Sequence, residues 1–304
     1  MAGTYLHLFL AREGLRRLAG ETDLIHGIGD GGADVDGPMS GAMAASFYAG
    51  VLGPDIGYFP HGPRALSDAI HQYHTADLVR SLHDQAESPA EVAFAAGWSL
   101  HVYTDLAVHP ELEQRAAKLQ AVDPLPLGTD SWHKRIEWGL DCQTLEWTSM
   151  RLWDSPLDFL MDDQSSGVLG RAAAKWFGPL LDESALAAGA RSTHRWVRRL
   201  APILLWTGGC QRTDRSRTCR IAAAILRSLK RPLAAMRSSD SRRDDAAAIL
   251  APLRDDEQWL LHLRHLAVAS VDDFIAGWGT SHRQLENRHL STGKQIHTTY
   301  MASI

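Results

Sequence analysis

The stretch GWSLHVYTDLAVHP, residues 97–110, carries the strongest structural signal in this chain. His101, Asp105 and His109 recur every four residues within it, among mostly apolar neighbours. Side chains four residues apart lie one above another on a helix, so the spacing predicts a helix with three polar groups on one inward face. Polar groups facing a core need a strong partner, because their loss of hydration is otherwise uncompensated. Imidazole and carboxylate together point to a divalent metal ion.

A second segment repeats this pattern. In WHKRIEWGLD, residues 132–141, His133 and Glu137 are four residues apart and Asp141 lies one turn further. Taken alone, the pair fits a surface pair that supports a helix equally well. Together with the first stretch and the Pro54-Asp55 turn, it predicts a metal site. The candidate ligands in apolar helices or tight turns are His7, Asp55, His61, His71, His74, His101, Asp105, His109, His133 and Glu137.

The number of candidate ligands exceeds what one ion needs, because a zinc site takes three or four protein ligands. The sequence therefore predicts a cluster of two or three ions. Neighbouring cations suit phosphoryl chemistry, in which they activate a water, hold phosphate oxygens and stabilise the leaving oxygen.

Composition and periodicity favour an all-α protein with a substantial core. The chain has 304 residues, 45% of them hydrophobic, and strand-like alternation is scarce. Ligand-type residues are concentrated before about residue 145. We expect a metal-binding helical core over 1–155 and a helical part packed on it over 156–304, in one continuous domain. The predicted helices cover 5–18, 42–52, 66–84, 90–108, 112–119, 131–153, 170–176, 184–205, 215–236, 244–253 and 256–275.

Charge and hydropathy limit the partners. The net charge of −5 gives no electrostatic case for a stable nucleic-acid complex, and the locally basic segment over 195–231 fits a solvated helix face. No segment approaches the roughly 18 uninterrupted apolar residues of a membrane span. The first 20 residues lack the regions of a signal peptide, so we expect a cytoplasmic location.

Several motifs together resemble the zinc-dependent phospholipase C family, which is related in fold to the S1/P1 nucleases. They are PDIGYF (54–59), IHQYHTADLV (70–79), AFAAGWSLHVYTDLAVHP (93–110) and HKRIE (133–137). The resemblance covers about residues 4–145. It implies a multi-helical bundle that binds up to three zinc ions in a cleft and cleaves phosphodiester bonds of phospholipids or nucleic acids.

Carried over motif by motif, the resemblance divides the ligands among three ions. The first ion would take Asp55, His71, His101 and Asp105; the second would take His109, His133 and Glu137; the third would take His7, Asp105 and the N-terminal amine and carbonyl.

Asp55 would also orient or deprotonate the attacking water. His61 is an alternative to His71, and we favour His71 because it lies on a helix within the family's motif. Secreted family members expose a new N-terminus by processing. Nothing in this sequence predicts such a cut, so Met1 or Ala2 would have to serve the third ion.

These observations predict a zinc-dependent hydrolase of phosphate esters, acting on a small phosphorylated substrate or a phospholipid head group. Aromatic residues available to surround a choline-like cation are Tyr58, Phe59, Trp98, Trp132 and Trp138, although such residues also fit a core. Three alternatives stay open: a non-catalytic protein whose metal clamps helices, a nuclease or phosphatase acting on a small phosphorylated metabolite, and an interaction module whose ancestral site has decayed.

Overall fold

The computed structural model describes residues 3–20, 41–125, 128–147, 163–212, 253, 257–278 and 282–296. Within these ranges the regular elements are helices, and the only extended pairing is an isolated bridge between Arg288 and Gln295. The all-α prediction is confirmed. The elements are α1 (Thr4–Gly20), α2 (Gly41–Leu52), η1 (Ile56–Tyr58), α3 (Arg64–Gln72), α4 (Thr75–Gln85), α5 (Pro89–Val122), α6 (Thr129–Trp147), α7 (Asp163–Phe177), η2 (Gly178–Leu180), α8 (Glu183–Arg212) and α11 (Glu257–Trp278).

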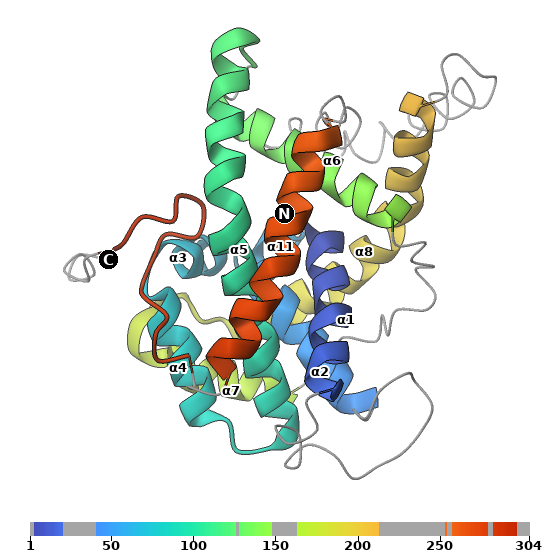
Figure 1. Ribbon diagram of the computed structural model, residues 1–304. Coiled ribbons are helices and arrows are strands. Elements are labelled where there is room, and N and C mark those ends of the chain that lie inside the picture. Colours follow the sequence, from blue (N-terminus) through green and yellow to red (C-terminus); the bar gives the residue numbers. More distant parts are fainter. Residues whose placement is uncertain are drawn as a thin grey trace.

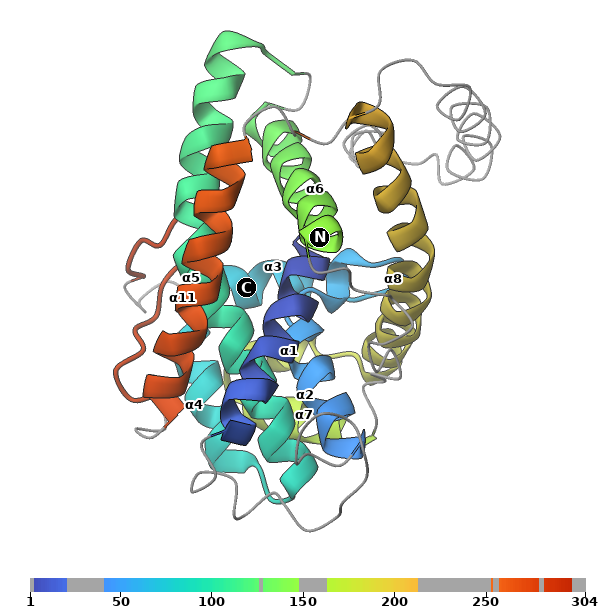
Figure 2. The same ribbon diagram turned by 45° about the vertical axis from the view of Figure 1, so that its right-hand side comes forward.

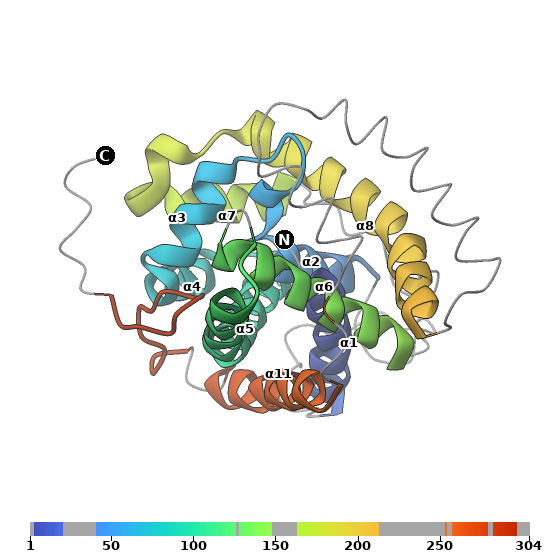
Figure 3. The same ribbon diagram turned by 90° about the horizontal axis from the view of Figure 1, so that it is seen from above.

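Helix α5 is the central element of the bundle. It contacts α1, α2, α4, α6, α7 and α11, and Figure 3 shows these helices arranged around it. In Figures 1 and 2, α1 and α11 lie beside α5 in both views, and α8 lies on the far side of α1 from α5. The stretch that carries His101, Asp105 and His109 therefore lies in the middle of the fold.

The start of α5 is strongly specified, and its length differs from the prediction. Ser88 accepts a hydrogen bond from the backbone N–H of Glu91, whose side chain accepts one from the N–H of Ser88, and Pro89 occupies the first turn. The sequence predicts two helices, over 90–108 and 112–119, but a single helix runs through Pro110. Packing against six neighbouring helices outweighs the one backbone hydrogen bond that the proline removes.

The single helix predicted over 66–84 is also wrong, because α3 and α4 are separated at Tyr73 and His74. His74 adopts a left-handed conformation with φ of 51°. The new helix start is capped from far along the chain: Asn287 Oδ1 accepts hydrogen bonds from the N–H groups of Ala76 and Asp77 at 2.9 and 3.1 Å. A local periodicity cannot reveal a break that a residue more than 200 positions away stabilises.

Two glycines allow α2 to cross α5 at close range. A Cβ on Gly97 would lie 2.0 Å from the carbonyl oxygen of Phe47, and a Cβ on Gly50 would lie 2.0 Å from that of Phe94. Only hydrogen fits at either position, so the two backbones are nearly in contact. One turn after Gly97, His101 consequently reaches the backbone of α2.

Helices from both halves of the chain share one hydrophobic core. Buried apolar residues of α1, α2 and α5 belong to the same cluster as those of α7, α8 and α11. The expected division near residue 155 falls outside the described residues, as do the helices predicted over 215–236 and 244–253. We propose one continuous domain on the basis of the shared core. Among the described helices, none is long and apolar enough to cross a membrane.

The close crossing of α2 and α5 at Gly97 predicts that two Gly→Ala substitutions change the free energy of unfolding in opposite directions. Gly97→Ala forces a methyl group against a backbone carbonyl and should lower the free energy of unfolding by about 3 kcal/mol. Gly170→Ala is the matched control, because it lies within α7 with no atom near the added Cβ, and it should raise stability by about 0.5–1 kcal/mol. Urea unfolding followed by circular dichroism measures both. Equal effects of the two substitutions would show that the crossing is not constrained.

Candidate metal centre

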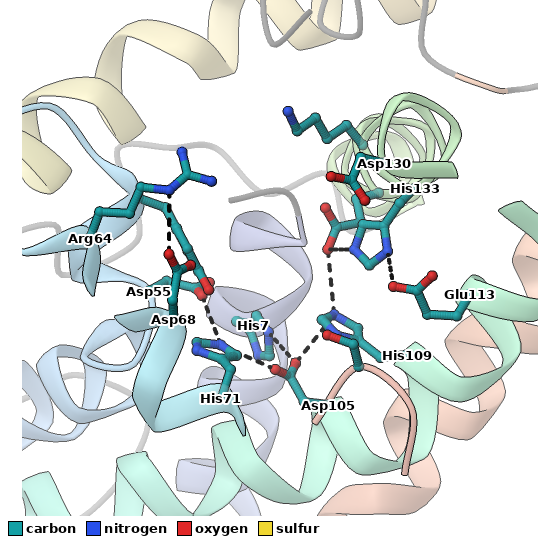
Figure 4. A pocket seen from close by; sticks show the side chains of 14 residues that line it. His7, Asp55, Arg64, Asp68, His71, Asp105, His109, Glu113, Asp130 and His133 are labelled. Atoms are coloured by element: carbon teal, nitrogen blue, oxygen red, sulfur yellow. Dashed lines mark hydrogen bonds and ion pairs between the residues drawn. The ribbon is translucent and has the colours of Figure 1, made fainter. Parts of the chain in front are cut away.

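Eight polar side chains from four helices and one turn converge beside the middle of α5. Their ligand-type atoms form three groups, and within each group these atoms lie within 4.8 Å of one another. In Figure 4, Asp105 occupies the centre, with His7, His71 and His109 directed toward it. The groups are His7, His101 and Asp105; Asp55, His71 and His101; and His109, His133 and Glu137.

The first group to consider joins Asp55, His71 and His101. The Nδ1 of His71 donates to the carbonyl of Ser67 at 2.8 Å, and the Nδ1 of His101 donates to that of Val51 at 2.8 Å. A carbonyl only accepts, so each neutral ring carries its proton on Nδ1 and has a lone pair on Nε2. The two Nε2 atoms face each other at 3.4 Å. Two lone pairs held at that distance need a cation between or beside them.

Asp105 connects this group to the other two. Its Oδ2 lies 3.1 Å from the Nε2 of His101 and 3.6 Å from that of His71. Its Oδ1 lies 3.1 Å from the Nε2 of His7 and 3.6 Å from that of His109. The carboxylate is almost fully buried, and four imidazoles surround it. Both oxygens are therefore positioned to serve different ions.

The third group lies between α5 and α6. Glu137 Oε1 lies 3.4 Å from His109 Nε2 and 3.1 Å from His133 Nε2. The other ring nitrogen of His133 donates to Glu113 Oε1 at 2.9 Å. A carboxylate behind a histidine is the arrangement that orients metal-binding imidazoles and raises their basicity. Glu113 was not among the predicted site residues, although it continues the four-residue spacing of His109 by one more turn.

Electrostatics in the cluster favour positive charge at its centre. Burial alone would lower the pKa of His101, but the carboxylates of Asp105 and Asp55 raise it to about 9. Burial likewise opposes protonation of His133, and Glu137 and Glu113 raise its pKa to about 10. Burial would raise the pKa of Asp105, yet the neighbouring imidazoles hold it well below its usual range. The carboxylates stay ionised, and the imidazoles supply either a proton or a lone pair to a cation.

The donor set fits zinc. Four ligands around a zinc ion at about 2.0–2.1 Å are separated from one another by about 3.3 Å, and the N···O separations across the groups are 3.1 to 3.6 Å. Asp105 Oδ2 is buried and makes no hydrogen bond despite its close imidazoles. An orphaned buried oxygen amid ring nitrogens is what a metal-ligand cluster leaves when its partner is a cation rather than a hydrogen-bond donor.

The groups border a cavity of about 200 Å³ that opens between α3 and α6. Its walls include residues that sequence reasoning did not select, namely Arg64, Asp68, Glu113, Asp130, Lys134 and Ser291. His61 is exposed, with φ of 68°, and belongs to none of the three groups, whereas His71 belongs to one. His74 pairs with Asp77 and stacks on Trp176, away from the groups.

A hairpin near the end of the described chain, residues 282–296, forms another wall of the cavity. The N–H of Leu290 donates to the carbonyl of His71 at 2.8 Å, and the N–H of Arg288 and the hydroxyl of Thr75 are joined at 3.0 Å. Ser291 lines the cavity beside these bonds. No local pattern in the sequence indicates this hairpin, because His71 and Thr75, to which it bonds, lie more than 200 residues earlier in the chain.

The profile of the family described as zinc dependent phospholipase C matches residues 7–185, more than half of the chain. The chain belongs to the zinc-dependent phospholipase C family. The resemblance inferred from the motifs is confirmed, and the match extends past residue 145, where the motifs ended. No curated protein and no solved structure gives a significant match. Family membership and the three residue groups together support a metal-dependent phosphoesterase in general.

The contact between His133 and Glu113 predicts an effect on zinc affinity. Glu113→Gln removes the negative charge behind the imidazole and should weaken zinc binding at this group about tenfold. Glu111→Gln is the control, because Glu111 is an exposed carboxylate on the same helix, outside the cavity lining. Competition with a chelating dye measures both affinities. An unchanged affinity in Glu113→Gln would contradict the supporting role of Glu113.

A second prediction concerns Asp141, which positions the start of α1. Its Oδ1 accepts hydrogen bonds from the N–H groups of Tyr5 and Leu6 at 3.0 and 3.1 Å, and its Oδ2 is buried without a hydrogen bond. Burial, helped by the charge of Glu137, raises the pKa of Asp141 to about 8 despite these two donors. The folded protein thus holds a proton that the unfolded chain releases near pH 4.

This proton stabilises the fold at low pH, and the stabilisation is lost as pH rises from about 4 toward 8. In metal-free protein, the stability of the wild type should fall by about 3 kcal/mol relative to Asp141→Asn between pH 5 and 7.5. The asparagine keeps the accepting oxygen but does not titrate. Urea unfolding at several pH values, with a chelator present, measures the difference. Parallel pH profiles would refute a neutral Asp141.

Proposed function

We propose that this chain is a zinc-dependent hydrolase of phosphate esters. The observation that supports it most directly is the convergence of imidazole Nε2 atoms and carboxylate oxygens, at the separations of a zinc coordination shell, on the wall of an open cavity. The proposed ligands are His7, Asp55, His71, His101, Asp105, His109, His133 and Glu137.

The proposed division follows the three groups. Asp55, His71, His101 and Asp105 would hold one ion, and His109, His133 and Glu137 a second. A third would use His7 and the second oxygen of Asp105 with the N-terminal amine and carbonyl. Residues 1 and 2 lie outside the described part of the chain, so we propose two ions as the minimum.

When bound, zinc would lower the pKa of a water molecule and neutralise charge on the phosphate oxygens. In the proposed reaction, the water oxygen bonds to phosphorus, and the ester oxygen leaves with its electron pair and takes up a proton. Asp55 lines the cavity, so its carboxylate would orient the water and accept the proton that the water loses. Burial raises the pKa of Asp55, but His101 and His71 outweigh it and keep the group ionised. The carboxylate is therefore ionised at neutral pH, as a group that accepts a hydrogen bond from the water must be.

The open cavity favours catalysis over a purely structural role. Structural zinc sites close all four positions and are rich in cysteine, whereas these groups contain no cysteine and include His7, Asp55, Asp105 and Glu137 on the cavity wall. Inorganic phosphate should therefore bind to the zinc-loaded protein.

Paired histidine variants test the proposal. The wild type should bind at least two zinc ions per chain and hydrolyse bis(p-nitrophenyl) phosphate. His71→Asn should lose about one ion and lower kcat/KM about 100-fold, because a ligand of the central cluster is missing. His61→Asn is the matched control, since asparagine tolerates the left-handed backbone at that position, and it should keep both properties. Fewer than one zinc per chain, or equal losses in the two variants, would overturn the proposal.

A further inference from the structure

The aromatic residues near the centre leave no open cage for a quaternary ammonium group. Trp98 is fully buried, and Phe59, Trp132 and Trp138 are at most 7% exposed. Tyr58 alone among them lines the cavity, and the guanidinium of Arg64 lies 5.7 Å from its ring centroid. A cage for a choline-like cation needs several accessible rings, but Tyr58 is a single ring and already lies against the Arg64 guanidinium.

Hydrogen-bond donors instead occupy three sides of the cavity mouth. Arg64 begins α3, Lys134 lies on α6, and Ser291 lies on the hairpin, so the three come from separate elements. Arg64 contacts Asp68 through Nε at 3.6 Å, and Figure 4 shows its terminal nitrogens on the side away from that carboxylate. A guanidinium has five N–H donors, so this contact leaves donors for a ligand.

The carboxylates at the mouth have structural partners that reduce their attraction for a cationic ligand. Asp68 faces Arg64 one turn earlier on α3, and burial, Asp55 and Asp68 together raise the pKa of Tyr58. Asp130 lies in the first turn of α6, where the helix dipole stabilises negative charge. Arg64 and Lys134 both line the cavity, so their positive charges would add to the charge of the proposed zinc ions.

We propose that the mouth formed by Arg64, Lys134 and Ser291 binds a second anionic group of the substrate. This inference rests on the proposed function, since the scissile phosphate would lie on the metal cluster. The substrate class is then a small phosphate ester whose alcohol portion carries a carboxylate or a further phosphate, and not a choline ester. In the basic segment over 195–231, the described side chains are those of residues 195–199, and none of them lines the cavity.

A matched series of phosphonates tests the charge preference without turnover, because the P–C bond resists hydrolysis. Each compound carries a two-carbon link to a carboxylate, a tert-butyl, a trimethylammonium or an ammonium group. Calorimetry on the zinc-loaded protein should show the carboxylate compound binding about tenfold more tightly than the trimethylammonium compound, with the tert-butyl compound between them.

Three variants locate the preference. Arg64→Gln and Lys134→Gln should each reduce the ratio of carboxylate to trimethylammonium affinity about threefold, with little change for the tert-butyl compound. Arg16→Gln is the control, because Arg16 is similarly exposed and paired with a carboxylate but lies outside the cavity lining, and it should leave the ratio unchanged.

The outcomes separate this inference from the proposed function. Equal or tighter binding of the trimethylammonium or ammonium compound overturns the anion-binding mouth and leaves the phosphoesterase proposal standing. Absence of binding by all four phosphonates overturns both. A ratio that falls equally in Arg16→Gln assigns the preference to overall charge and also overturns the role of the mouth.

Discussion

A buried carboxylate, Asp105, is the constraint on which the site depends. A charge removed from water needs compensation close by, and Asp105 receives it from imidazoles on α1, α3 and α5. Helices α1 and α3 must therefore hold fixed positions relative to α5. The charge in the core thus specifies an arrangement of helices that hydrophobic packing alone would fix less sharply.

The backbone takes part in this arrangement as much as the side chains do. The backbone carbonyls of Val51 and Ser67 accept hydrogen bonds from His101 and His71 and so orient the two imidazoles. The bond between Val51 and His101 requires α2 and α5 to cross closely, which the glycines at the crossing allow. The geometry of the candidate ligands consequently depends on backbone groups of residues that are not ligands themselves. This is the usual relation between ligands and the shell that orients them.

The helical class and the stripe on α5 could be predicted because both follow from local spacing. The same spacing extends to Glu113, yet Pro110 suggested that the helix had ended, so the carboxylate behind His133 was missed. The break before α4 and the wall containing Ser291 depend on contacts with residues 282–296. Contacts between residues so far apart in the sequence produce no periodic pattern in it. The eight candidate ligands were selected from the sequence through their chemistry, and the structure brings them together, whereas the mouth is visible only in the fold.

The bond from Leu290 to His71 has a consequence for synthesis on the ribosome. All residues whose side chains are candidate ligands lie within the first 137 residues, so they leave the ribosome long before residue 290 does. During that interval the nascent chain has the cluster but lacks the hairpin and the cap of α4. Pairing over so long a sequence distance forms late. The candidate ligands are therefore synthesised before the hairpin that forms one wall of their cavity, and the hairpin is the last described part of the site to be added.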